Sequence, residues 1–135
     1  MAVNVFSNPI NGPASITNRG TIAADVELTA NSTEIQRMDV GATDRKIQLP
    51  NPALCLDRVF EISNISSTNT LAVHQYNATA FTGAVIALPN GGVTGTLKSV
   101  TSAVGANNAT YTSARYFCDG TTWILLSANC NFYFA

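Results

Sequence analysis

Charged side chains are scarce in this chain. Lys, Arg, Asp and Glu make up 11% of the 135 residues, with seven basic and eight acidic residues and a net charge of −1, whereas about 25% is usual. The basic residues form no cluster, and Arg45–Lys46 is their one adjacent pair. A protein that binds nucleic acid or an anionic membrane needs several cations together. We therefore expect neither nucleic acid nor a membrane as a partner.

Long apolar runs are also missing. No segment approaches the roughly 20 apolar residues of a membrane-spanning helix. The residues after Met1 include neither the cationic start nor the apolar stretch of a secretory leader. We therefore expect a protein that is made in the cytoplasm.

Residues that carry chemistry are few. His74 is the one histidine, and the three cysteines, Cys55, Cys118 and Cys130, include no Cys-x-x-Cys pair, so a Cys/His zinc site is not expected. No nucleophile motif surrounds a thiol, and no Asp-x-Asp-x-Asp pattern suggests a calcium loop. We predict no catalytic residues, no metal and no cofactor. Buried free thiols and a structural histidine on a strand are the expected roles.

Polar uncharged residues take the place of the charges. The chain contains 14 Asn, 10 Ser and 16 Thr, together 40 of 135 residues. Thr favours strands and Asn favours turns. A surface solvated by hydroxyls and amides responds weakly to salt, because it has few charges to screen.

Hydrophobic residues recur with period two, which is typical of half-buried strands. Such alternation occurs over 21–29, over 46–49 and over 58–63, and turn signals interrupt the pattern about every 8–12 residues. No helical period and no internal repeat is evident. We predict an all-β fold: a single-domain antiparallel β-sandwich or barrel of about eight short strands, spanning 21–135.

The strongest local signal is a hairpin. Tyr116-Phe117-Cys118 precedes Asp119-Gly120, and Trp123 to Leu126 follow. Asp-Gly tolerates the positive φ angles of a type I′ turn. Trp123 is expected in the core, although stacking on a sugar is an alternative.

Both ends differ from the middle of the chain. Residues 1–20 include Pro9 and Pro13, which favour an extended arm. This arm is either frayed or lies on a neighbouring subunit, with Phe6, Pro9 and Ile10 as apolar anchors. The C-terminal Phe132, Tyr133 and Phe134 form either a last strand or a self-association contact.

Three short segments carry motifs that are found in a known group of proteins. Residues 43–50 (TDRKIQLP), followed by 58–64 (RVFEISN), resemble a pattern in phage virion β-domains, where a charged strand ending in Leu-Pro precedes a Phe-x-Ile-x-Asn strand. Residues 118–123 (CDGTTW) resemble the Asp-Gly-x-x-Trp hairpin that often closes such domains.

The resemblance implies a structural virion protein. A compact domain with an arm is similar to capsid decoration (cement) proteins, which typically form homotrimers that clamp neighbouring capsomers. It implies the major capsid protein as partner and a place on the capsid surface. On this interpretation we expect the arm residues Phe6, Pro9 and Ile10 to be capsid contacts. Because no catalytic motif is present, we expect no enzymatic activity. The alternative is a receptor- or glycan-binding module of a phage tail fibre or head fibre.

Overall fold

The computed structural model describes residues 15–66, 68–79, 83–86, 96–97 and 113–129. Its elements are β1 (Ile16–Thr21), β2 (Val26–Glu27), β3 (Ile35–Asp39), β4 (Arg45–Gln48), the 3₁₀ turn η1 (Pro52–Leu54), β5 (Val59–Asn64), β6 (Leu71–His74), β7 (Thr96–Leu97), β8 (Ser113–Cys118) and β9 (Trp123–Asn129).

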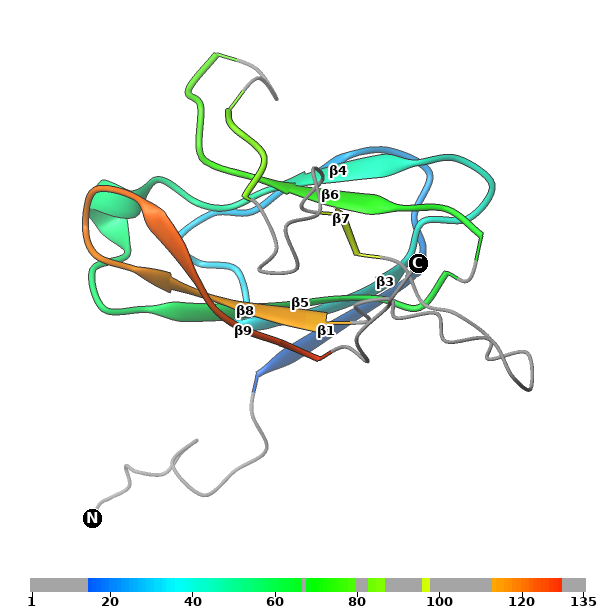
Figure 1. The fold of residues 1–135 in the computed structure, drawn as a ribbon, viewed down its shortest axis with the longest axis horizontal. Coiled ribbons are helices and arrows are strands. Elements are labelled where there is room, and N and C mark those ends of the chain that lie inside the picture. Colours follow the sequence, from blue (N-terminus) through cyan, green and yellow to red (C-terminus); the bar gives the residue numbers. More distant parts are fainter. Residues whose placement is uncertain (1–14, 67, 80–82, 87–95, 98–112, 130–135) are drawn as a thin grey trace, which may run out of the picture.

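The strands form two sheets, which lie as two layers in Figure 1. The five-stranded sheet has the order β1-β3-β5-β8-β9, and the four-stranded sheet has the order β2-β4-β6-β7. The described residues include no α-helix, so the predicted all-β class is confirmed. The predicted antiparallel pairing is present in β5-β8, β6-β7 and β8-β9. It is wrong for β1-β3, β3-β5, β2-β4 and β4-β6, which are parallel.

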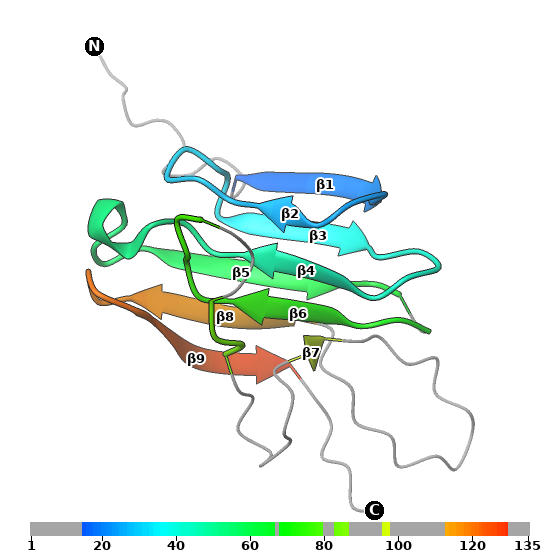
Figure 2. The ribbon, with the colours of Figure 1, turned by 90° about the horizontal axis from the view of Figure 1, so that it is seen from above.

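The first six strands alternate between the two sheets. The chain runs in one direction through β1, β3 and β5 and returns in the other through β2, β4 and β6 (Figure 2). The chain therefore winds three times around a common core, with one strand of each sheet in every turn. We call this winding the coil. Each parallel neighbour is reached by a connection that crosses the other sheet, which satisfies the need of parallel strands for a long crossover.

Successive turns of this coil place like residues on top of one another. Val26, Ile47 and Val73 are in register on the three parallel strands and are all buried. Leu28 and Leu49 lie two residues further along the chain than Val26 and Ile47, and both are buried. The backbone N–H of Leu28 donates to the carbonyl of Gln48. Stacking of aliphatic side chains in this way buries the inner face of the three parallel strands β2, β4 and β6.

A side chain also ties the first turn of the coil to the second. Asp25 precedes β2, and its Oδ1 accepts a hydrogen bond of 2.9 Å from the backbone N–H of Lys46 in β4. The carboxylate thereby extends the ladder beyond the short strand β2 and satisfies a backbone donor.

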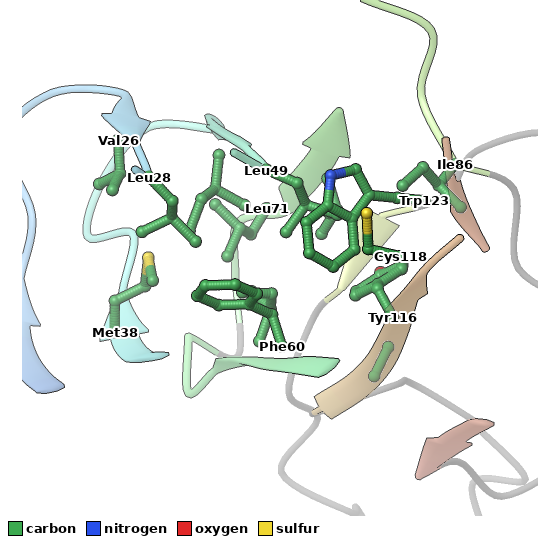
Figure 3. Close-up of a cluster of buried hydrophobic side chains, with 14 of the residues drawn as sticks. Val26, Leu28, Met38, Leu49, Phe60, Leu71, Ile86, Tyr116, Cys118 and Trp123 are labelled. Carbon is green, nitrogen blue, oxygen red and sulfur yellow. The ribbon is translucent and has the colours of Figure 1, made fainter. Parts of the chain in front are cut away.

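The core lies between the sheets, and Trp123 is its largest side chain (Figure 3). The Trp123 ring is 2% exposed and meets Phe60 edge to face, with ring centroids 5.5 Å apart. Its Nε1–H donates to the carbonyl of Pro50 over 2.8 Å. The expected core role of Trp123 is therefore confirmed.

The β8–β9 hairpin is present as predicted, but its turn is not type I′. Cys118 pairs with Trp123, which leaves a four-residue loop. Only Gly120 of the Asp-Gly pair has a positive φ, at 92°. Asp119 instead accepts hydrogen bonds of 2.8 Å from the backbone N–H groups of Thr121 and Thr122, and these fix the loop.

Some predicted segments differ in extent. The alternation over 21–29 belongs to no single strand, because β1 ends at Thr21 and β2 spans only Val26–Glu27. Part of the stretch predicted as an arm, residues 16–20, lies in β1, which pairs with β3. Of the cysteines, Cys55 and Cys118 are buried and free, and Cys130 lies outside the described residues.

Candidate functional site

The outer face of the five-stranded sheet carries several exposed apolar side chains. Strand alternation directs one set of side chains away from the core. This set, which we call the outer apolar face, consists of Ile16, Ile35, Val59, Phe117, Ile124 and Leu126. Ile16 and Leu126 are each 55% exposed and Ile124 is 45% exposed.

Cross-strand register brings three of these side chains into one row. Val59 pairs with Phe117, and Phe117 pairs with Ile124, on the adjacent strands β5, β8 and β9. Their partners at the next positions, Phe60 and Tyr116, point inward and are fully buried. A row of an aromatic and two branched aliphatic side chains, facing away from the core, is suited to packing against a second apolar surface.

A second row combines apolar and charged residues. Ile16 pairs with Ile35, Ile35 with Glu61, and Glu61 with Arg115. Arg115 Nε lies 3.7 Å from Glu61 Oε1, and both side chains are more than a third exposed. In water such a pair contributes little to stability. At the centre of an apolar face it provides a hydrogen-bonding pattern that can select a partner and its orientation.

A shallow groove of about 210 Å³ lies on this face and is lined by Glu34, Ile35, Val59, Glu61 and Arg115. Glu34 is also 3.8 Å from the guanidinium of Arg58. The groove therefore has apolar walls and carries both signs of charge. Its shape and mixed charge suit a protruding side chain of a protein partner better than an enclosed small molecule.

Strand β9 is an edge of the sheet within the described part of the chain. The register between β8 and β9 shifts between Arg115 and Tyr116, where Leu126 is the extra residue opposite. A bulge of this kind twists an edge strand and discourages indiscriminate pairing. A partner at this edge would therefore contact the side chains of Ile124 and Leu126 rather than pair with the backbone of β9.

The residues considered for catalysis are held in structural positions. His74 is the last residue of β6 and is 7% exposed, with Nδ1 2.7 Å from the carbonyl oxygen of Gly83. The thiol of Cys118 contacts the carbonyl of Pro52 at 3.3 Å. Burial raises the pKa of the Cys55 thiol, and Arg58 only partly offsets this. A thiol with a raised pKa is a poor nucleophile at neutral pH.

Among the residues that the structure describes, no group of three or more His, Cys, Asp or Glu side chains is placed to hold a metal ion. None of their helical segments is long and apolar enough to cross a bilayer.

The arm residues Phe6, Pro9 and Ile10 and the tail residues Phe132, Tyr133 and Phe134 fall outside the described residues. The outer apolar face was not predicted. Its signal was present at Val59, Phe117 and Ile124, which are apolar at strand positions that alternate with the core set and should face water.

Comparison with known proteins does not assign the chain. No family model matches the sequence, and neither a curated protein nor a solved structure is similar to it.

Proposed function

We propose that this chain is a structural virion protein: a capsid decoration (cement) protein that docks on the outer surface of a phage capsid and bridges neighbouring capsomers. Its partner is the major capsid protein, and its working form is a homotrimer. In this proposal the two layers form an open β-sandwich that presents binding surfaces and carries out no reaction.

The outer apolar face is the observation that carries the proposal. It spans the five-stranded sheet from Ile16 on β1 to Leu126 on β9, and both residues are 55% exposed. A protein without a partner gains nothing from such a surface, since each apolar square ångström left in water costs about 25 cal/mol. A face of this kind is typical of protein–protein contacts, which supports a docking role.

The low charge and the resemblance of 43–50, 58–64 and 118–123 to phage virion β-domains give further support. A subunit that binds the assembled shell but not its separated parts stabilises the shell by mass action. An apolar contact with few ion pairs also holds over a wide range of salt concentration.

The experiment is co-sedimentation of the purified protein with expanded phage capsids that lack it, together with the melting temperature of those capsids. We expect the protein to bind the capsids saturably and to raise their melting temperature. The double variant Ile124→Ser with Leu126→Ser should bind at least about tenfold more weakly, because both side chains lose buried area. Val85→Ser is the matched control, since Val85 is 41% exposed and lies outside the five-stranded sheet.

Two results would contradict the proposal. One is the absence of binding by the folded wild-type protein. The other is equal loss of binding in Val85→Ser and in the double variant.

A further inference from the structure

A second groove lies where the parallel strands of the four-stranded sheet end. It has a volume of about 280 Å³ and lies beside η1 and the segments that follow β2 and β6. We propose that this groove binds a single ring of a neutral saccharide. The inference does not depend on the capsid function, because none of the residues that line this groove belongs to the outer apolar face.

The groove includes a carboxylate that is held in place. Glu27 Oε2 accepts a hydrogen bond of 3.2 Å from Gln48 Nε2, and Gln48 is fully buried. Gln48 Oε1 in turn accepts from the backbone N–H of Asn77 at 3.2 Å. The second oxygen of a carboxylate fixed in this way is an acceptor for a ligand hydroxyl, at little cost in side-chain entropy.

Two further polar side chains of the groove can each donate a hydrogen bond to a ligand. Asn51 Oδ1 accepts from the backbone N–H of Ala53 at 3.0 Å, so the amide nitrogen of Asn51 is the group left for a ligand. Thr29 Oγ1 accepts from the backbone N–H of Asn31 at 3.2 Å and still has its own hydrogen to donate. Neighbouring hydroxyls of a sugar both donate and accept, and therefore match this mixture.

Apolar side chains complete the groove. Tyr76 follows β6 by two residues, and Leu54 ends η1 with 67% of its surface exposed. An aromatic ring presents an apolar face with a polar tip. The C–H face of a pyranose packs against such a ring, while its hydroxyls reach Glu27 and Asn51.

The charge of the lining excludes other ligand classes. Glu27 is its one charged residue, so a phosphate or carboxylate would meet a repelling charge there. The guanidinium of Arg58 lies beside the groove, but it is already bound to the carbonyls of Ala30 and Ser32 and to Glu34. An ammonium group only donates hydrogen bonds, and the donors of Asn51 and Thr29 would remain unmatched. The volume lies near the lower limit of about 300 Å³ for small-molecule sites, which fits one ring rather than a long chain.

The test is titration of the full-length protein with a set of neutral monosaccharides (glucose, galactose, mannose, N-acetylglucosamine and rhamnose), followed by saturation-transfer NMR. We expect millimolar binding of at least one sugar. Tyr76→Ala should lower the affinity about tenfold, as expected for loss of an aromatic stacking surface. Glu27→Gln keeps the shape of the groove and should lower the affinity by a smaller factor.

Leu54→Ala and Leu56→Ala form a matched pair. Both leucines are more than 60% exposed, but only Leu54 lines the groove. Leu54→Ala should weaken sugar binding, and Leu56→Ala should leave it unchanged. Circular dichroism of each variant establishes that it is folded.

Three outcomes would overturn the inference. The first is no transfer to any sugar by the folded wild-type protein. The second is sugar binding that Tyr76→Ala leaves unchanged. The third is binding of tetramethylammonium, used as the competing probe, with no binding of sugars.

Discussion

The carboxylate of Asp44 accepts a 2.8 Å hydrogen bond from the backbone N–H of Thr70, 26 residues later in the chain. Asp44 precedes β4 and Thr70 precedes β6, and these strands are parallel neighbours. Asp25 makes the corresponding bond to Lys46 one turn of the coil earlier. Aspartates before the strands thus link successive turns of the coil along one edge.

Asp44→Ala should destabilise the protein. The change removes a charge-assisted hydrogen bond and leaves the N–H of Thr70 to water, so we expect a loss of about 1–2 kcal/mol in the free energy of unfolding. Urea denaturation monitored by Trp123 fluorescence measures it. Asp44→Asn keeps an acceptor oxygen and should lose less. Equal stability of Asp44→Ala and the wild type would show that the hydrogen bond between Asp44 and Thr70 does not stabilise the fold.

Trp123→Phe should be more costly. It removes the hydrogen bond to Pro50 and leaves a cavity beside Phe60, and the expected loss is about 2–3 kcal/mol. Thermal unfolding followed by circular dichroism gives the change. Phe117→Leu, on the outer face, is the control and should cost less than about 1 kcal/mol. Equal losses in the two variants would contradict the assignment of Trp123 to the core.

Acid should weaken the β8–β9 hairpin through Asp119. Hydrogen bonds from the backbone N–H groups of Thr122 and Thr121 hold the pKa of this carboxyl below its ordinary value of 3.8. Because the folded-state pKa is the lower one, the stabilisation is present above 3.8 and is lost as the pH falls through the folded-state pKa.

Denaturation curves from about pH 5 to about pH 2 test this linkage. The wild type should lose more stability over that range than Asp119→Asn, whose side chain does not titrate. Parallel curves for the two proteins would contradict the role of the Asp119 carboxylate.

The two described thiols should be protected from modification. Cys118 is fully buried, and Cys55 is 1% exposed and has a raised pKa because of that burial. In the native protein at neutral pH, iodoacetamide should therefore label both slowly, and in denaturant it should label both fully. Peptide mass spectrometry quantifies each site separately. Rapid labelling of either cysteine in the folded protein would contradict the packing around η1.

The strands and much of the core follow from the sequence, but their arrangement does not. Alternation correctly placed Phe60 and Ile62 inward, and the Asp-Gly turn located the hairpin before Trp123. Period two, however, is the same in parallel and antiparallel sheets. It therefore could not show that the connections 22–34 and 40–58 each carry the chain to the other sheet and back.

The candidate sites were harder to predict for a related reason. The row Val59–Phe117–Ile124 exists only because β5 and β9 both pair with β8. Glu27 and Tyr76 line one groove only because the coil stacks the ends of β2 and β6 near η1. Both arrangements depend on long-range register, which composition and local pattern do not contain.

Hydroxyl-radical footprinting of the capsid-bound and free protein, with oxidation read at each side chain by mass spectrometry, tests the proposed docking face most directly. If the outer apolar face contacts the capsid, oxidation of Phe117, Ile124 and Leu126 should fall on binding, while oxidation of Val85, which is exposed and pairs with His74 of the four-stranded sheet, should persist. Unchanged oxidation of Ile124 and Leu126 in the bound protein would show that the shell is contacted by another surface.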